Sequence, residues 1–467
     1  MANLAPGMEG GEQMLGEGIT AGGGLLLGAG SWELGAGAVK ADRLDQRSSV
    51  PTLAPVTTPH APTSSAFGSY TPAVARQETS RRIHTIDVTR GVAMILMAID
   101  HVRVYAGVPP GGPVPSVFFT RWITNFVAPA FAFLSGTSAY ILGQRLGSKA
   151  ALSKYLVTRG LILVLLELTV IRVFWTFNFH FNEYLLAGVI WMLGWCMVIM
   201  AAVIWLPTAA IGALGVAVIF LHNLMDFLPA TTNESLPQSA LAPLWQILYF
   251  AGPIQIGEQG PTLAVLYSIF PWIGVMAAGY AFGAVMVMEQ KRRDNICVGI
   301  GVAAIVLFFL LRTTDIYGDP RHWHAAANAR MPAFLRYINT TKYPASLDFL
   351  LMTLGPTILL MPLFDRARGQ IGEWIATFGR VPMFYYLMHI PAIHLAALMV
   401  SLIREGKVDP WLFANHPMMN PPPPDNYMWS LGLLYLVFAI VVAILYFPSR
   451  WYWQRKSTNP APWMRYI

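Results

Sequence analysis

The chain has 467 residues, of which 55% are hydrophobic and only 12% are charged, and its formal net charge is +7. The charged share is about half of the roughly 25% that is typical of soluble globular domains. Because the apolar residues come in long blocks, this composition excludes disordered, fibrous and disulfide-scaffold proteins. It indicates a polytopic membrane protein in a lipid bilayer, and we attribute the cationic excess to cytoplasmic loops rather than to nucleic-acid binding.

Residues 1–80 differ in composition from the rest of the chain. They contain a glycine run at 22–24 and a tract rich in Pro, Thr, Ser and Ala over 51–72. Such a segment buries too little apolar surface to offset the entropy that it loses on ordering. We therefore predict a disordered N-terminal arm over 1–80 and a membrane domain over 81–467.

The apolar blocks that follow predict about ten transmembrane helices, each of roughly the length that crosses 30 Å of hydrocarbon. The expected ranges are 88–108, 120–142, 157–177, 185–205, 208–225, 263–288, 296–312, 347–364, 376–402 and 429–449. Two prolines interrupt the apolar block 240–257, which favours an interfacial or re-entrant piece. Lys and Arg are more numerous on the side that holds both termini. The expected fold is therefore an all-α transmembrane bundle with both termini in the cytoplasm.

The first span carries ionisable residues near both of its ends, where such residues are costly inside a bilayer. Asp87 and Arg90 are spaced i,i+3 near its start, which favours an ion pair at the interface. Asp100 lies about 19 Å beyond Asp87 along the helix axis, which places it past the midplane of the bilayer. The adjacent His101 can act as a general base near neutral pH, and Asp100 can pair with Arg103. We favour a functional cluster here over a purely structural one.

Other spans add four candidate residues to this site. Arg121 and Asn125 lie one turn apart at the start of the second span, and Arg121 is near the depth of Arg103. The two arginines could hold an anionic group, or they could simply extend to the interface. Glu167 lies in the middle of the third span. His389 lies in the ninth span between two prolines, which predict a bent or broken helix lining a cavity. The Ser, Gly, Thr and Ser of 135–138 favour close helix packing instead.

The outer loop 312–346 holds an unusual number of charged residues together with His322 and His324. No carboxylate stands near these histidines at a familiar metal-ligand spacing, so we predict no metal site. The cluster could bind an anionic or polar substrate, or it could be an ordinary solvated loop. Nucleotide-binding and hydrolase motifs do not occur in a plausible context, so ATP-driven transport and serine or zinc hydrolysis are not supported.

Several blocks of the sequence, taken in order, resemble a family of bacterial membrane proteins long labelled as a domain of unknown function. The blocks run from Ile86 to Arg103, from Phe119 to Thr124, from Phe133 to Ser138, from Thr158 to Val170, from Phe270 to Gly274 and from Gly379 to Pro391. This family is grouped with the catalytic domain of heparan-alpha-glucosaminide N-acetyltransferase. The resemblance covers roughly 82–450 and leaves out the arm.

The resemblance implies a transmembrane acyltransferase in the bacterial inner membrane. It is compatible with an oligomer of this chain. It would transfer an acyl group from acetyl-CoA or another acyl-CoA to an amine or hydroxyl of a glycan or envelope acceptor. The animal enzyme has an asparagine at the position matching His101 and a catalytic histidine a little downstream, whereas no histidine follows His101 here until His180. Either His101 supplies the base itself, or this branch does different chemistry. A late block of the animal enzyme is similar to the region around His389.

The leading hypothesis assigns His101 as the base and Asp100 as the residue that tunes charge with Arg103. Arg121 and Asn125 would hold the thioester carbonyl or the acceptor, with Glu167 and His389 as further substrate-binding residues. A rival interpretation is a transporter or channel with a polar intramembrane pathway through the same residues. A third is a membrane scaffold without catalysis.

Overall fold

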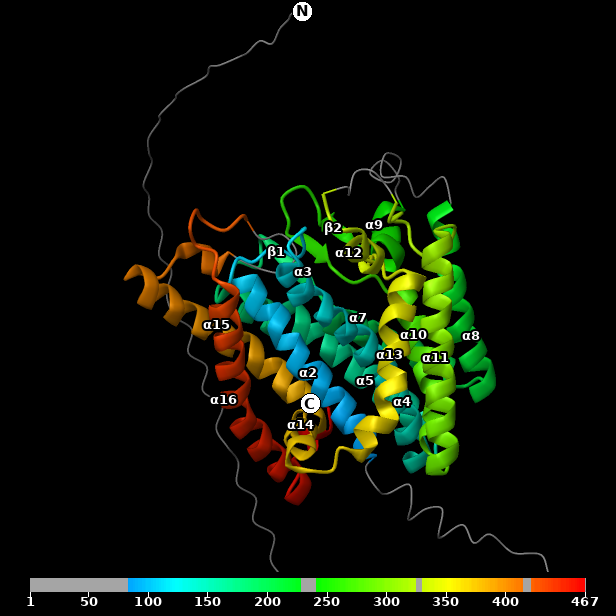
Figure 1. Ribbon diagram of the computed structural model, residues 1–467. Helices are drawn as coiled ribbons and strands as arrows, with labels where there is room; N and C mark the ends of the chain where they lie inside the picture. The colour runs from blue at the N-terminus through cyan, green and yellow to red at the C-terminus, as the bar shows by residue number, and fades with distance from the viewer. Residues whose placement is uncertain (1–82, 228–240, 325–329, 415–420, 467) are drawn as a thin grey trace, which may run out of the picture. The chain divides into compact units, whose positions relative to one another are not determined.

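The computed structural model describes residues 83–227, 241–324, 330–414 and 421–466, all of which belong to one compact unit (Figure 1). The arm expected over 1–80 lies outside these residues. The described part is mostly helical and includes three short strands. Figure 1 shows β1, β2, α9 and α12 at one end of the long helices and α14 at the other end.

In the part of the chain that the structure describes, ten helices of 14 residues or more make up the bundle. They are α2 (His84–Tyr105), α4 (Val127–Leu146), α5 (Lys149–Leu166), α7 (Val189–Val203), α8 (Thr208–Leu221), α10 (Phe270–Met286), α11 (Gln290–Thr314), α13 (Leu347–Arg366), α15 (Pro382–Glu405) and α16 (Leu431–Thr458). Shorter helices are α3 (Pro115–Trp122), α6 (Arg172–Thr176), α9 (Ala242–Trp245), α12 (Ala333–Ile338) and α14 (Gln370–Arg380). Short 3₁₀ or π segments are η1 (Ile123–Phe126), η2 (Glu167–Ile171), η3 (His222–Phe227), η6 (Gln246–Phe250), η8 (Pro410–Phe413) and η9 (Pro462–Arg465).

Local sequence explains where several of these helices begin and end. The hydroxyls of Ser346 and Ser430 accept hydrogen bonds from backbone N–H groups in the first turns of α13 and α16. The expected break in the ninth span is confirmed, because α14 ends at Arg380 and α15 begins at Pro382. Proline fits the first helical position and cannot continue the preceding helix.

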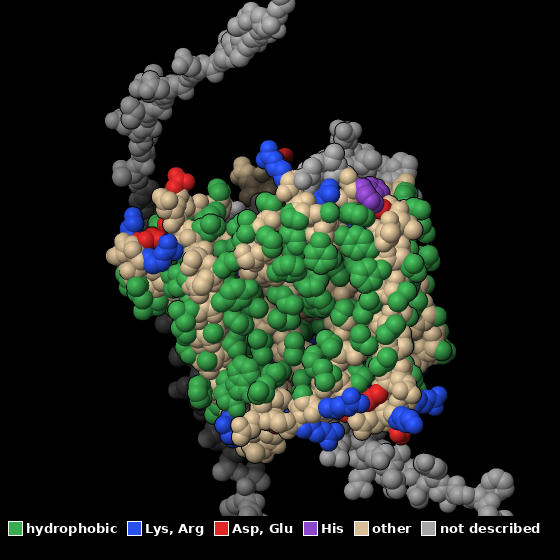
Figure 2. Space-filling model, in the orientation of Figure 1, with side chains coloured by type: hydrophobic (Ala, Val, Ile, Leu, Met, Phe, Trp, Pro, Cys, Tyr) green, Lys and Arg blue, Asp and Glu red, His purple; other side chains and the backbone are tan. Residues whose placement is uncertain are grey.

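The helices are those of a polytopic membrane protein. Within the described residues, six segments are long and apolar enough to cross a bilayer: Pro115–Leu146, Thr208–Phe227, Gln290–Thr314, Leu347–Arg366, Pro382–Glu405 and Leu431–Thr458. Two of the other expected spans coincide with the shorter apolar helices α7 and α10, and the last two fall on α2 and on the α5–η2–α6 segment. Figure 2 shows a broad apolar band on one face, with charged side chains gathered toward its two edges.

A small sheet departs from the all-helical expectation. It has the strand order β1-β3-β2, in which β1 (Tyr184–Ala187) runs parallel to β3 (Thr262–Val265) and β2 (Gly252–Gln255) runs antiparallel to β3. Strands β1 and β3 lie at the starts of the expected spans 185–205 and 263–288. An apolar run of four residues that leads into a helix has no periodicity of its own, so the sequence did not separate strand from helix there.

Glycines allow two helix pairs in the core to approach closely. A Cβ added at Gly136 of α4 would come within 1.9 Å of the Met276 carbonyl oxygen of α10, which confirms at Gly136 the packing role expected for 135–138. A Cβ at Gly91 of α2 would come within 2.1 Å of the Ile375 carbonyl oxygen of α14. One at Gly379 of α14 would come within 1.8 Å of the Asp87 carbonyl oxygen. Helix α2 is therefore held against α14 by backbone contact.

Candidate functional site

Helix α2 lines two separate cavities. Near its start, Ile86, Asp87, Arg90 and Met94 line a cavity of about 680 Å³, which we call the basic cavity. Toward its end, Asp100, His101 and Arg103 line a second cavity of about 850 Å³, which we call the histidine cavity. Tyr386 of α15 lines both of them. One helix and one aromatic side chain thus connect the two sites.

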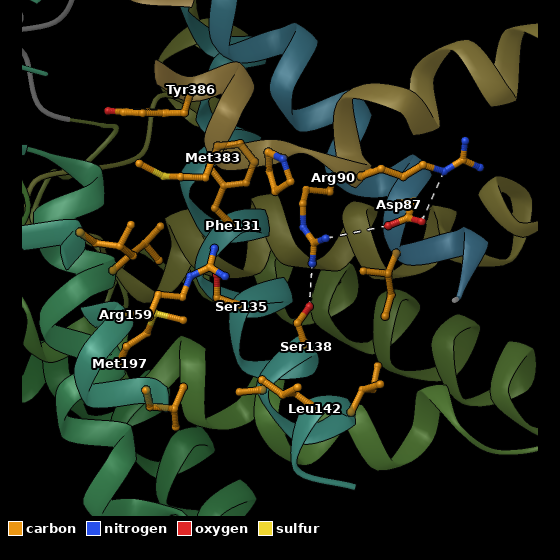
Figure 3. Close-up of a pocket in the computed structure, with 18 of the residues that line it drawn as sticks. Asp87, Arg90, Phe131, Ser135, Ser138, Leu142, Arg159, Met197, Met383 and Tyr386 are labelled. Atoms are coloured by element: carbon orange, nitrogen blue, oxygen red, sulfur yellow. Dashed lines mark hydrogen bonds and ion pairs between the residues drawn. The ribbon is translucent and has the colours of Figure 1, made fainter. Parts of the chain in front are cut away.

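The basic cavity has more cationic than anionic side chains in its lining. Its charged residues are Asp87, Arg90, Arg145, Arg159, Arg380 and Lys456. Figure 3 shows Arg90 between Asp87 and Ser138, with the guanidinium 4.0 Å from the Asp87 carboxylate and donating a 2.6 Å hydrogen bond to the Ser138 hydroxyl. The expected pairing of Asp87 with Arg90 is therefore present. A single carboxylate among five cations suits the cavity to an anionic ligand.

Arg159 brings an incompletely hydrogen-bonded guanidinium to the basic cavity. It extends from α5 into the same region as Phe131 and Met197 (Figure 3). Its Nη1 donates a 2.7 Å hydrogen bond to the Tyr155 hydroxyl, but its Nε is buried without an acceptor in the described part of the chain. A buried donor left without a partner is costly, so the Nε–H group of Arg159 is suited to donate a hydrogen bond to an anionic oxygen of a ligand.

An ion-pair cluster forms one wall of the histidine cavity. The Oδ1 of Asp100 lies 3.0 Å from the Nε of Arg103 and 3.6 Å from the Nε of Arg121. Asn125 accepts a 2.7 Å hydrogen bond from Nη1 of Arg121, which fixes that guanidinium on its other side. Asp100 thus pairs with Arg103 as expected. It also forms an ion pair with Arg121, which belongs to α3.

The two histidines of the candidate site form a hydrogen-bonded pair. Nδ1 of His101 lies 2.6 Å from Nε2 of His389, and the rings are stacked with centroids 4.8 Å apart. Nδ1 of His389 lies 2.7 Å from the Tyr386 carbonyl oxygen and 3.2 Å from that of Tyr385. Carbonyl oxygens only accept, so Nδ1 of His389 carries a proton.

That contact fixes the tautomer of both rings when they are neutral. With its proton on Nδ1, His389 has a bare Nε2, and it must accept a hydrogen bond from Nδ1–H of His101. The remaining Nε2 of His101 then carries a lone pair, and it makes no hydrogen bond to any residue that the structure describes. His101 lines the cavity beside Trp175, whose ring lies 4.8 Å away in an edge-on arrangement. This is the arrangement that a general base requires.

Glu167 lines the histidine cavity and has its own hydrogen-bond partner. It begins the π-helical segment η2, and its carboxylate accepts a 3.2 Å hydrogen bond from the backbone N–H of Ile190 in the first turn of α7. A carboxylate is favourable at a helix N-terminus. Glu167 therefore stabilises the start of α7, and the structure does not join it to the other candidate residues by a direct contact.

The outer loop contributes Lys342 and Tyr343 to the surroundings of the histidine cavity. Tyr343 lines the cavity together with Tyr267, which lies between β3 and α10, and Lys342 of the charged loop cluster lies beside them, 8% exposed. The ammonium of Lys342 lies 5.3 Å from the centroid of the Tyr343 ring and 5.8 Å from that of Tyr267. Burial and repulsion from Arg121 hold the pKa of Lys342 well below its ordinary value. No periodicity marks this loop, so only its excess of charge could have indicated these residues.

The rest of the same loop is structural. Arg312, fully buried, donates hydrogen bonds to the carbonyl oxygens of Tyr337 and Arg321, and it lies within 4.0 Å of carboxylates of the loop and of α13. His322 and His324 remain largely exposed and pair with Asp315. One end of the loop thus folds on itself, while the other end reaches the histidine cavity.

A comparison with protein families supports the relationship indicated by the sequence motifs. The family described as heparan-alpha-glucosaminide N-acetyltransferase, catalytic, matches residues 82–314. The match includes Asp100, His101, Arg103, Arg121 and Glu167, and it ends before Lys342 and His389. The family resemblance is thus confirmed over these residues. A comparison with curated proteins finds no match.

Proposed function

We propose, from the family match and from the two cavities joined by α2, that this protein is an integral membrane acyltransferase. It would transfer an acyl group, in the first place acetyl, from a coenzyme A thioester to a hydroxyl or amine of a glycan or envelope acceptor. The observation that carries the proposal is His101, which lines one cavity and is hydrogen-bonded to His389, with a cation-rich cavity at the other end of the same helix.

The basic cavity suits the donor. Coenzyme A carries phosphate groups, which arginine and lysine recognise through charge-assisted hydrogen bonds. The guanidinium of Arg159, with its unpartnered Nε, supplies one such donor. The acyl end would then extend past Tyr386, which borders both cavities, toward His101.

The histidine cavity suits the chemical step. Nε2 of His101 takes the proton of the acceptor hydroxyl or amine while the acceptor oxygen or nitrogen attacks the thioester carbon. The carbon–sulfur bond breaks, and the thiolate of coenzyme A leaves with the proton that His101 returns. The guanidinium of Arg121, fixed by Asp100 and Asn125, supports the thioester oxygen as it gains negative charge. His389 positions His101 rather than binding substrate.

The proposed topology has ten spans and places both termini in the cytoplasm of a bacterial inner membrane. The basic cavity would then open toward the cytoplasm, where acyl-CoA is made, and the histidine cavity would face the outer side. A cysteine introduced at the exposed Glu258, in the connection 226–262, should react with a membrane-impermeant reagent on intact cells. One introduced at the exposed Lys291 should react only after lysis. The reverse pattern would overturn the topology.

Acyl transfer can be tested directly with purified full-length protein, labelled acetyl-CoA and an envelope extract. We expect labelling of an acceptor by the wild type and a loss of about 10²- to 10⁴-fold in His101→Ala, the range for a general base. His322→Ala, an exposed histidine of the outer loop, is the matched control and should keep the wild-type rate. Equal labelling by His101→Ala and wild type would remove His101 as the base. Substrate flux into proteoliposomes without thioester consumption would support a transporter instead.

A further inference from the structure

Cationic groups outnumber carboxylates at the outer side of the histidine cavity. Arg103 and Arg121 share the single carboxylate of Asp100. Lys342 does not itself line the cavity, but its ammonium lies against the rings of Tyr267 and Tyr343, which do, and it interacts electrostatically with all three of these groups. Glu167, the other carboxylate of the cavity, is bonded to the backbone of α7. The local charge is therefore positive when Lys342 is protonated.

Lys342 is the least satisfied member of this group. Its side chain is more than nine-tenths buried, yet its ammonium makes no hydrogen bond or ion pair with any residue that the structure describes. The rings of Tyr267 and Tyr343 attract a cation, but they supply no counter-charge. Burying an ammonium without a paired anion is unfavourable, and a bound anion would remove much of that cost.

The arginines also keep donors available. Arg103 uses Nε for Asp100 and Nη1 for the Val108 carbonyl oxygen, and its Nη2 has no acceptor among the described residues. Asp100 and Asn125 fix the orientation of the Arg121 guanidinium. Two oriented guanidiniums and one ammonium beside a cavity form a binding arrangement for a carboxylate or a phosphate ester.

We infer that the histidine cavity recognises an anionic group, a carboxylate or phosphate ester on a sugar-like ligand, through Lys342, Arg103 and Arg121. The inference rests on the proposed function only in identifying that ligand as the acyl acceptor. Acceptor specificity would then depend on a charge next to the reacting hydroxyl or amine, and Lys342 would be the specificity-determining residue. Neutral sugars would be poor ligands.

Binding can be measured without any acyl donor, by calorimetry on the purified full-length protein in an uncharged detergent. The probes are glucose 6-phosphate and glucose, which differ in the anionic group. We expect the wild type to bind the phosphate at least about 10-fold more tightly than glucose, the size of one charge-assisted contact. Lys342→Met should lose most of this preference, whereas Lys342→Arg should retain it.

Three controls test where the anion binds and whether each variant is folded. Lys407→Met removes an exposed lysine and should bind as the wild type does. Arg159→Gln alters the basic cavity, and a loss of the preference for glucose 6-phosphate in this variant would place the anion in that cavity and overturn the inference. Melting temperatures report folding, and Lys342→Arg keeps the test valid if Lys342→Met is unstable.

The source of the anionic group is tested in nanodiscs. Probe binding should be the same in phosphatidylcholine and phosphatidylglycerol, and abolition by phosphatidylglycerol would overturn the assignment to a sugar-like ligand in favour of a lipid headgroup. Equal affinity for both probes, or equal preference in wild type and Lys342→Met, would overturn the inference. Charge-selective binding without acyl transfer would instead contradict the proposed function and leave the anion site standing.

Discussion

His101 of α2 and His389 of α15 meet with Nδ1 of the first 2.6 Å from Nε2 of the second. The two residues are separated by 288 positions in the chain, and the contact exists only because the proline-initiated α15 packs against α2. The carbonyl oxygens beside His389 determine which nitrogen of each ring carries the proton. His389 is thus the residue through which α15 contacts His101, the proposed base.

Replacing His389 tests this relationship. His389→Phe removes the acceptor for Nδ1–H of His101, and we expect kcat for acyl transfer to fall at least about 10-fold, part of the contribution of an oriented general base. His389→Gln provides an amide oxygen that can accept the same hydrogen bond, so it should recover activity relative to His389→Phe. Steady-state kinetics on both variants is the measurement. A glutamine variant no better than the phenylalanine variant would contradict the positioning role.

Asp100→Asn should destabilise the protein more than the same substitution would at an exposed aspartate. The change leaves Arg103 and Arg121 without their shared carboxylate, and removing one partner of a largely buried ion pair costs up to about 3 kcal/mol. We expect a lower melting temperature in detergent. Asp100→Asn combined with Arg121→Gln should recover part of the loss, because one uncompensated charge is removed. A double variant less stable than the sum of the single changes would argue against this charge balance.

Arg159→Gln should affect donor binding more than chemistry. If Arg159 contacts a phosphate of the donor, its loss should raise KM for acetyl-CoA about 10-fold and leave kcat nearly unchanged. Arg450→Gln, an exposed arginine of α16, is the matched control and should give wild-type constants. A fall in kcat with KM unchanged would place Arg159 at the reacting atoms instead.

Gly136→Ala should prevent the close packing of α4 and α10. The added Cβ would meet the Met276 carbonyl oxygen at 1.9 Å, so the two helices must separate, and we expect a large drop in melting temperature and yield. Gly299→Ala is the matched control, because, beyond the adjacent backbone of its own helix, no described heavy atom lies within 4 Å of a Cβ added there. Alanine also favours a helix by about 1 kcal/mol over glycine, so this control should be neutral or slightly stabilising.

Affinity for the anionic probe should fall as pH rises through the pKa of Lys342 in the empty site. That pKa is held well below its ordinary value, mainly by burial and then by Arg121, while Asp100 opposes the shift. Anion binding favours the protonated ammonium, so binding takes up a proton, and the affinity for glucose 6-phosphate is greatest below that pKa. The groups that face Lys342 are Asp100, His101, Arg103, Arg121, Tyr267 and Tyr343.

Calorimetry across pH, in two buffers of different ionisation enthalpy, measures both the affinity and the proton uptake. Lys342→Arg should give a much flatter profile, because a guanidinium keeps its charge throughout the range. An unchanged pH dependence in Lys342→Arg would assign the effect to another group around the cavity.

Much of the membrane domain was predictable because its signals are local. Long apolar blocks indicated the helices, proline indicated the break before α15, and the run 135–138 indicated close packing. Spacing along one helix also predicted the pairing of Asp100 with Arg103. Each of these inferences needs only residues within a few turns of one another.

The contacts that complete the site come from distant parts of the chain. Nothing in the local sequence indicates that His389 reaches His101, or that Lys342 lies near Arg121. Glu167 was expected among the substrate-binding residues because it interrupts an apolar run, yet its carboxylate meets the backbone at the start of α7. The strands β1 and β3 were missed because four apolar residues do not reveal a period.

The glycine contacts between α2 and α14 have a consequence for donor selection. With Gly91 and Gly379 pressed against backbone, α2 cannot slide along its axis, so Arg90 and His101 keep a separation of about 16 Å, set by the helical rise. The distance between the two cavities along α2 is therefore fixed. In the proposed reaction, a donor anchored in the basic cavity would need an arm of that length to carry its acyl group to His101, and we expect a compact donor such as acetyl phosphate not to support acyl transfer.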